Sequence, residues 1–330
     1  MTTFKEIRGT AIEVVSSDPS APEEGQIWYN SSSGTLKGYL NTGIGAWASG
    51  GNLNTSRYIL AGFGATNTAA IAANGNNPGG YVIATESYNG TSWTTLPATI
   101  NTTRASSGGT GTQTAGVIAG GAGPGGNYLQ TTENWNGSVW TSSGNLNTGR
   151  RAIRLIGTQT AALGFGGYKA PAGNITNASE SYNGSTWTNT PSLNTARQGP
   201  GGSGTQTAGL GFGGEPGPAV TGATESYNGS WTNVNSMNTA RADPGSASTS
   251  QTAALAFGGY STATTGATEL WNGSTWTNSP TSLATARRGP GGAGTQAGAL
   301  AFGGESPGGA IASTEKWTYP SIGIKTITVS

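Results

Sequence analysis

Two charged residues recur at fixed spacing along the 330-residue chain, and they are the first candidates for chemistry. A glutamate returns every 44 to 47 residues, and each of the first five glutamates precedes an arginine by 16 to 18 residues. The glutamates are Glu86, Glu133, Glu180, Glu225, Glu269 and Glu315, and the arginines are Arg57, Arg104, Arg150, Arg197, Arg241 and Arg287. Six copies of each could ring a ligand site, but a residue that every repeat carries usually serves the repeat. We expect these side chains to bind backbone groups or each other between neighbouring repeats, because an orphaned buried charge costs about 3–5 kcal/mol.

The other acidic residues do not form a catalytic pattern. The chain has two aspartates, Asp18 and Asp243, and the only non-periodic acids in its loops are Glu215 and Glu305, two repeats apart. A glycosidase needs two carboxylates about 5–9.5 Å from each other. Cysteine and histidine are absent from the sequence, which excludes disulfides and Cys/His metal sites. We therefore expect no enzyme activity, no metal and no cofactor.

A third group of residues lies in segments that differ between repeats. Each segment separates a Gly-Gly pair from the next periodic glutamate, and the segments should gather on one face. Variable loops on a fixed scaffold indicate a binding face. Aromatic and amide side chains there could stack on sugar rings and hydrogen-bond to them; an alternative is that these are tolerated surface loops. The candidate ligand-binding residues are Tyr81, Asn127, Tyr128, Tyr168, Lys169 and Tyr260.

The repeat that carries these residues predicts four short strands. The stretch ESYNGSTW, from Glu180, predicts a hairpin with a type I′ turn at Asn-Gly. TAGLGFGG predicts a strand ended by glycines, and the glycine-rich GPGGSG before it predicts an innermost strand approached closely by its neighbours. Six such four-stranded units around an axis form a β-propeller, and the period is in the range of propeller blades.

The repeat resembles a kelch repeat over residues 47 to 319. The features that carry the resemblance are the Gly-Gly pair, the variable loop, the aromatic two residues after the glutamate, the turn and the spaced tryptophan. The resemblance implies a six-bladed kelch-like β-propeller, although these blades are poor in Leu, Ile and Val. Some kelch propellers are copper radical oxidases, but those need histidine ligands and a cysteine-modified tyrosine, which this sequence lacks.

The offset between the two periodic charges predicts how the propeller closes. Arg57 has no glutamate upstream, where Lys37 stands instead, and Glu315 has no arginine downstream. Joining the chain ends in a circle would supply each missing partner. We expect Trp47 to lie on the outer strand of the blade that begins at Arg287, which would remove free sheet edges.

The remaining segments divide the chain further. We expect an N-terminal docking arm at 1–24, with a frayed terminus as the alternative, and a hairpin at 25–46 around the stretch SSSG. The propeller would span 47–320. The tail at 321–330 would be a last strand on the hairpin or a contact to another chain. The hairpin sequence GQIWYN…GTLKG is similar to tailed-phage virion proteins, and FKEIRG is similar to marine phage structural proteins.

Charge and hydropathy narrow the partners. The formal net charge is +1 without a basic patch, which argues against nucleic acid. No apolar run is long enough for membrane insertion, and the N-terminus lacks the apolar core of a signal peptide. We expect a protein made in the host cytoplasm and carried on the virion surface, on a tail or head appendage. It would dock on other virion proteins through its arm and bind a host-surface glycan or protein; homo-oligomerisation stays open. The alternative is a protein-interaction scaffold, or a capsid or tail decoration protein without a receptor role.

Overall fold

The structure is a computed structural model that describes residues 12–23, 25–40, 44–169, 174–247, 249–319 and 323–327. The chain divides into two compact units, one of residues 1–44 with 319–330 and one of Gly45–Thr318. The described residues form strands and one short 3-10 turn, Pro124–Gly126, and they contain no α-helix. The predicted all-β class is therefore confirmed. Of the predicted docking arm, residues 1–11 and 24 lie outside the described residues.

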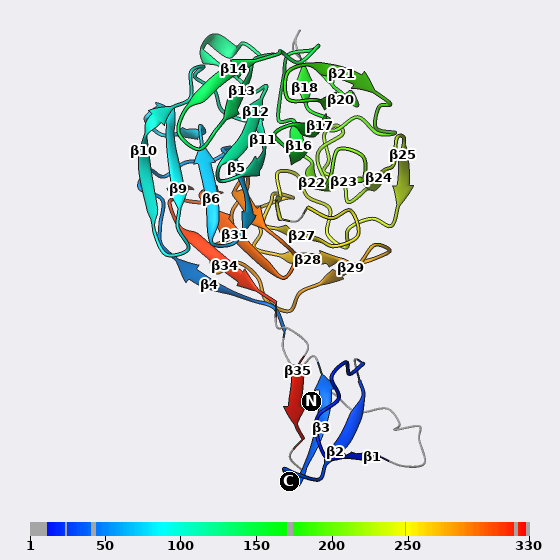
Figure 1. The fold of residues 1–330 in the computed structure, drawn as a ribbon. Coiled ribbons are helices and arrows are strands. Elements are labelled where there is room, and N and C mark those ends of the chain that lie inside the picture. The colour runs from blue at the N-terminus through cyan, green and yellow to red at the C-terminus, as the bar shows by residue number, and fades with distance from the viewer. Residues whose placement is uncertain are drawn as a thin grey trace. The chain divides into compact units, whose positions relative to one another are not determined.

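The described part of the larger unit contains six antiparallel four-stranded sheets and three smaller sheets of two or three strands (Figure 1). The first strands are β5 (Ala61–Thr66), β11 (Gly108–Thr112), β16 (Arg154–Thr158), β22 (Gly201–Gly204), β26 (Gly245–Ala247) and β30 (Gly291–Gly294). The second strands are β6 (Ala69–Ala73), β12 (Ala115–Ala119), β17 (Ala161–Phe165), β23 (Gly209–Phe212), β27 (Ala254–Phe257) and β31 (Gly298–Phe302). The third strands are β9 (Ala84–Tyr88), β13 (Thr132–Trp135), β20 (Ser179–Tyr182), β24 (Thr224–Tyr227), β28 (Thr268–Trp271) and β34 (Thr314–Thr318). The fourth strands are β10 (Trp93–Thr99), β14 (Trp140–Ser143), β21 (Trp187–Thr190), β25 (Trp231–Val234), β29 (Trp276–Asn278) and β4 (Ala46–Gly50).

The first strands lie at the centre of the larger unit. Each contacts the first strand of the next sheet, and β30 contacts β5, so the contacts run in a circle. Figure 1 shows these strands around the middle of the unit and the fourth strands at its rim. The arrangement is consistent with a β-propeller, and it confirms the innermost position predicted for the glycine-rich strand.

Aromatic rings explain why the central strands need glycine. A Cβ atom placed at Gly201 would lie 2.1 Å from the Phe212 ring, and one at Gly202 would lie 2.8 Å from the Phe165 ring of the preceding sheet. Real Cβ atoms do not approach other atoms so closely. The close approach that the sequence predicts is thus made by phenylalanine side chains of the second strands.

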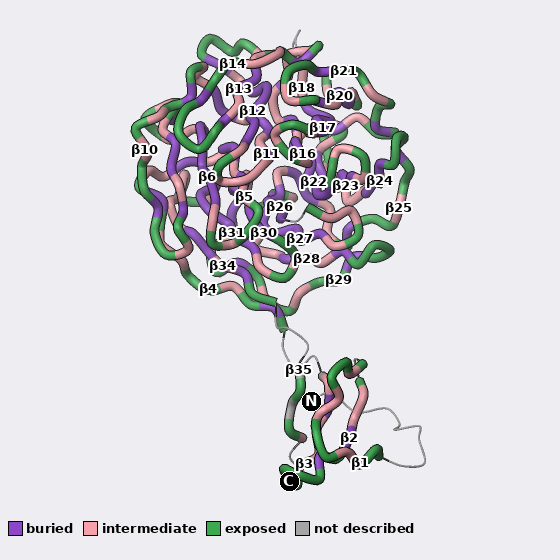
Figure 2. Tube along the Cα trace, viewed as in Figure 1, coloured by how far each residue is buried: buried purple, intermediate pink, exposed green. Residues whose placement is uncertain are grey.

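The hydrophobic core lies in layers between adjacent sheets. One layer joins Leu163 and Phe165 of β17 to Tyr227 and Trp231 of the next sheet. The other sheets share equivalent layers, including one that joins Leu300 and Phe302 to Tyr88 and Trp93. Figure 2 shows buried residues along the inner strands and exposed residues along the rim. No sheet can bury its apolar faces alone, which ties each repeat to its neighbours.

The hairpins between third and fourth strands correct one prediction. Tyr182 pairs with Trp187, so the hairpin is present, and Gly184 has a φ of 97°. Asn183 is not among the residues with positive φ, so the turn is not type I′. Its side-chain Oδ1 instead accepts the N–H groups of Ser185 and Thr186, at 3.0 and 2.9 Å. The asparagine acts through its side chain, as in an Asx turn, rather than through a left-handed backbone.

The first and last parts of the larger unit share a sheet. β34 pairs antiparallel with β4, with Trp47 opposite Trp317. The indole Nε1 of Trp47 donates to Thr268 Oγ1 of the preceding sheet at 2.9 Å. This confirms that Trp47 lies on the outer strand of the sheet that follows Arg287.

The smaller unit is a four-stranded sheet. Its order is β1 (Glu13–Val15), β2 (Ile27–Asn30), β3 (Thr35–Leu40) and β35 (Gly323–Thr326), with β1 parallel to β2. The hairpin around Ser31–Gly34 is as predicted. The tail pairs with β3, which confirms the first of its two predicted roles. The carboxylate of Asp18 accepts hydrogen bonds from Trp28, Asn30 and Lys37 at 3.1, 2.8 and 2.9 Å.

Candidate functional site

The periodic arginines and glutamates form buried ion pairs, but not with the partners that the sequence suggested. Each arginine pairs with the glutamate that follows it by 28 to 30 residues, not with the one that precedes it. Arg57 therefore has its partner, Glu86, at 2.5 Å, and Glu315 has Arg287. The prediction that circular closure supplies missing partners was wrong. The pairing differs because each arginine lies in the segment that leads into a sheet, and the third strand of that same sheet brings its glutamate back beside this segment.

These pairs hold the repeat together. Arg197 donates to Gly213 O and Ala223 O at 3.0 and 2.6 Å and to Glu225 at 2.5 Å. Glu225 also accepts the N–H of Asn194 at 2.7 Å, in the segment that enters from the preceding sheet. Burial lowers the pKa of the Arg197 guanidinium, and Glu225 opposes this shift. All six arginines are fully buried, which agrees with the predicted structural role and leaves them no ligand to reach.

Two of the pairs are less well aligned. Arg150 and Arg241 lie 3.0 and 3.1 Å from their glutamates. Their guanidinium N–H groups lack hydrogen-bond geometry toward any described acceptor. The ion pair itself is kept in both repeats.

The residue two positions after each arginine closes a ring around the axis. The backbone N–H of each donates to the carbonyl of its counterpart in the adjacent repeat, at 2.8 to 3.0 Å, and the sixth bond returns to the first member. All six have φ between 46° and 57°. The members are Ile59, Ser106, Ala152, Gly199, Asp243 and Gly289. We call this set the axial ring. A left-handed backbone is strained for a β-branched residue such as Ile59, so the ring's bonds and packing must outweigh that strain.

A cavity of about 250 Å³ lies on one side of the axial ring. Four ring members line it, with Asp243 as the only charged residue in the ring. The position directly after each periodic arginine supplies most of its wall. The wall residues are Tyr58, Arg151, Gln198, Glu215, Ala242 and Arg288. Glu215 instead opens the variable segment of its repeat. These side chains differ between most repeats, unlike the scaffold that holds them.

The position after each arginine pairs with the first residue after Gly-Gly. Arg151 pairs with Tyr168 in a short sheet of β15 (Arg150–Arg151), β18 (Tyr168–Lys169) and β19 (Asn174–Ile175). Gln198 bridges to Glu215, and its Nε2 donates to the Glu215 carboxylate at 2.9 Å. Sequence reasoning missed the wall positions. Their signal was available: the residue after the invariant arginine is Tyr, Ala, Arg, Gln, Ala and Arg in turn.

The structure brings some of the predicted binding residues together. Tyr128 and Tyr168 meet edge to face at 5.7 Å, and the Arg151 guanidinium lies 5.7 and 4.8 Å from their ring centres. Tyr260 lies beneath Arg288, 5.5 Å from its guanidinium.

The other predicted residues lie apart from this cluster. Tyr81, in β8 (Gly80–Tyr81) opposite β7 (Asn76–Asn77), donates its hydroxyl to Gly123 O at 2.9 Å. The Asn127 amide donates to Pro124 O at 3.3 Å. Lys169 pairs through its backbone with Arg150. None of the six predicted binding residues lines the cavity.

The two loop carboxylates are both occupied by neighbours. Glu305, in β32 (Glu305–Ser306) opposite β33 (Gly309–Ala310), accepts from Arg288 Nε at 2.7 Å. Glu215 accepts from Gln198. Asp243 differs, because its carboxylate accepts no hydrogen bond from a described residue. Burial raises the pKa of Asp243, Arg288 opposes that shift, and Glu215 adds to it.

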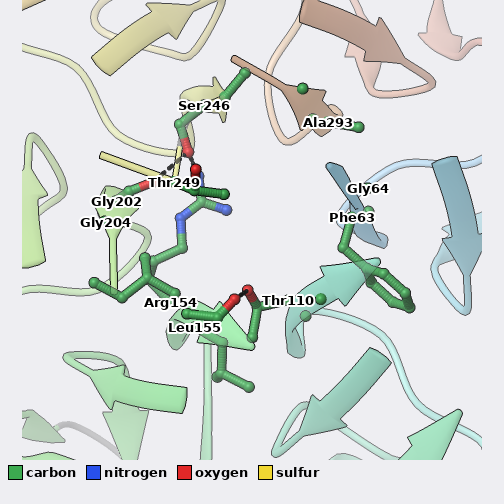
Figure 3. Close-up of a pocket in the computed structure, with 18 residues that line it drawn as sticks. Phe63, Gly64, Thr110, Arg154, Leu155, Gly202, Gly204, Ser246, Thr249 and Ala293 are labelled. Carbon is green, nitrogen blue, oxygen red and sulfur yellow. Dashed lines mark hydrogen bonds between the residues drawn. The ribbon is translucent and has the colours of Figure 1, made fainter. Parts of the chain in front are cut away.

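On the other side of the axial ring the first strands surround a narrower space (Figure 3). Among the described residues that line it, Arg154 carries the single charge. Its side chain reaches across Gly202 to Ser246, which in turn donates to Gly202 O at 2.7 Å. Burial lowers the pKa of Arg154 to about 10, while the nearby Asp243 opposes the shift. Arg154 therefore fills the axis on this side, and the wider cavity is the better candidate for a ligand.

The described residues hold no group of three or more acidic, histidine or cysteine side chains that could bind a metal ion. They also contain no helix of the length and apolar character that a membrane crossing requires. The chain matches no protein-family model and no curated protein.

Proposed function

We propose that this chain is a non-enzymatic adhesion protein of a tailed-phage particle, built as a six-bladed kelch-like β-propeller. In this proposal the cavity beside the axial ring binds a host-surface glycan. The observation that carries the proposal is the contrast between scaffold and wall. Six repeats keep the same arginine, glutamate and tryptophan, yet their wall positions carry Tyr, Arg, Gln, Glu and Ala around one cavity. Fixed frameworks with varied rims are typical of recognition surfaces.

The chemistry of the wall suits a polyhydroxylated ligand. Carboxylates and amides accept and donate hydrogen bonds to hydroxyl groups, and a tyrosine ring can cover an apolar sugar face. Tyr58, Gln198 and Glu215 supply these groups. Two arginines of the wall lie over tyrosine rings. Arg151 lies over Tyr128 and Tyr168, and Arg288 lies over Tyr260.

A glycan array tests this proposal directly. The full chain is compared with a variant in which Tyr58 and Gln198, which line the cavity, are changed to alanine, after both are shown to fold. We expect the wild type to bind a subset of glycans and the variant to lose most of that binding. If the wild type binds no glycan, the adhesion proposal fails. A decoration or scaffold protein without a receptor role, which would bind protein through the same face, then becomes the better account.

The docking part of the proposal concerns the smaller unit. Its first strand, β1, is an edge strand, and Val14 on it is 66% exposed. Deleting residues 1–24 would also remove Asp18, which Trp28, Asn30 and Lys37 bind, so a point change is the sharper test. Val14→Asp should reduce incorporation into particles while glycan binding stays unchanged. Normal incorporation of this variant would contradict docking through β1.

A further inference from the structure

We infer that the ligand of this cavity is a sugar that carries a carboxylate group, and that Arg151 binds the carboxylate. This inference rests on the proposed glycan-binding function and specifies its ligand class. Arg151 lines the cavity. Its guanidinium makes no ion pair and no hydrogen bond with any described residue, although Asp243 and Glu215 line the same cavity and the charge of Arg151 opposes the rise that burial causes in the pKa of Asp243.

The second arginine of the wall provides an internal contrast. Arg288 lies over Tyr260 much as Arg151 lies over Tyr168, at 5.5 and 4.8 Å. Yet Arg288 is paired with Glu305 at 2.7 Å, so its charge is neutralised within the protein. Arg151 and Arg288 occupy equivalent positions in their repeats. These two repeats differ in the residue that follows Gly-Gly, which is an acid, Glu305, in the repeat of Arg288 but not in that of Arg151. Arg151 faces Tyr168 at that place, which leaves its charge for a ligand.

The tyrosines prepare Arg151 for a planar anion. Contact with the rings of Tyr128 and Tyr168 restricts the guanidinium while occupying its faces rather than its N–H groups. The free N–H groups form a fork that matches a carboxylate with two parallel hydrogen bonds. An arginine held in this way loses little conformational freedom when the ligand arrives.

The rest of the lining argues against a simple anion. Asp243 and Glu215 line the same cavity and would repel any anion, and a doubly charged phosphate or sulfate more strongly than a single carboxylate. The Asp243 carboxylate has no hydrogen-bond donor among the described residues, and hydroxyl groups of a ligand would supply one. A neutral sugar would satisfy Asp243 but leave Arg151 unused. A ligand with one carboxylate and several hydroxyl groups satisfies both, as acidic sugars do.

The test uses the full chain and pairs of sugars that differ in the acidic group. Binding of 3′-sialyllactose is compared with lactose, and glucuronic acid with glucose, by isothermal titration and ligand-observed NMR. We expect the acidic member of at least one pair to bind and its neutral partner to bind much more weakly. Arg151→Gln should weaken acidic binding about ten- to a hundredfold, the usual effect of losing hydrogen bonds to a charged group. Arg151→Lys should restore only part of it, because lysine lacks the planar fork.

The control removes one positive charge outside the cavity. Lys316, which does not line the cavity, donates to Gly90 O at 3.2 Å, and Lys316→Gln should leave acidic binding close to that of the wild type. Thermal melts of all variants establish that they fold. Neutral and acidic sugars binding equally, with no effect of Arg151→Gln, would overturn the inference while leaving the proposed function intact. Wild-type protein that binds no sugar of either kind would instead remove the proposed function itself.

Discussion

The indole Nε1 of Trp93 donates a hydrogen bond to Thr314 Oγ1 at 3.0 Å, although the two residues are 221 positions apart. The same bond joins Trp187 to Thr132 of the preceding sheet at 2.9 Å. The bond between the last and first sheets is thus of the same kind as one between consecutive sheets. Both threonines are 1% exposed.

This equivalence predicts that losing the bond destabilises the protein equally at the interface of the first and last sheets and at an interface between consecutive sheets. Thr314→Val leaves the buried indole N–H of Trp93 without an acceptor, and Thr132→Val does the same to Trp187. Each change should lower the free energy of unfolding by about 1–3 kcal/mol, measured by urea denaturation. A loss at Thr132 without one at Thr314 would mean that the first and last sheets do not pack together in solution.

The buried ion pairs predict a second, larger effect. Glu225→Gln leaves the Arg197 guanidinium, which is fully buried, without its counter-charge. The free energy of unfolding should fall by about 3–5 kcal/mol. The double variant Arg197→Met with Glu225→Gln should recover part of this loss, because the orphaned charge is gone. If the double variant loses the sum of both single effects, the two side chains do not act as a pair.

The crowded central strand gives a matched pair of glycine substitutions. Gly201→Ala places a Cβ atom 2.1 Å from the Phe212 ring and should cost about 1–3 kcal/mol of stability. A Cβ atom placed at Gly217 would meet no other atom within 4 Å, and this glycine lies outside the left-handed region. Gly217→Ala should therefore be neutral or stabilise by up to about 1 kcal/mol. Thermal melts of the two variants check the contrast, and equal effects would contradict the packing described for β22.

Asp18 predicts how the smaller unit responds to acid. Hydrogen bonds from Lys37, Asn30 and Trp28 lower its pKa to about 2. A depressed pKa means that the ionised carboxylate stabilises the folded unit above its unfolded pKa of about 3.9, and that this contribution is lost as pH falls through about 2. The indole N–H resonance of Trp28, followed by NMR from pH 5 to pH 1.5, should shift with a midpoint near the lower value. In Asp18→Asn no such titration should occur. A midpoint near 3.9 in the native protein would show that the bonds to Asp18 do not favour its charged form.

The fold was largely predictable because the residues that determine it recur in every repeat. The recurring tryptophans, the Gly-Gly pairs and the glycine-rich strand identify the four strands, and Trp47 identifies the sheet that the two ends share. Two details were not accessible from spacing. Asn183 caps its turn through its side chain, which leaves the same sequence signature as a left-handed asparagine. Arg57 pairs with the later glutamate because an antiparallel sheet brings the third strand back, and sequence order alone does not show which glutamate returns.

The candidate site was predicted only in part. None of the six predicted residues lines the cavity. The rings of Tyr128, Tyr168 and Tyr260 lie against two arginines of its wall instead. Arg151 and Arg288 directly follow periodic arginines, so the sequence gives no sign that they have a separate role from the buried arginines beside them. Asp243 belongs to the axial ring. The left-handed backbone of this ring could not be predicted at Ile59 and Ala152, because neither residue is a glycine. Backbone geometry of that kind becomes visible only when all six copies are seen together.

The axial ring is held by main-chain N–H and carbonyl groups alone. The residues beside it can therefore change identity without removing any of the bonds that join the repeats at the axis. The framework can therefore be conserved while the wall residues of the cavity change. A lineage could exchange Tyr58, Arg151 or Gln198 in single steps and reach new ligands while folding as before. The same property would suit a combinatorial library, in which the wall positions are randomised and every member keeps the same frame.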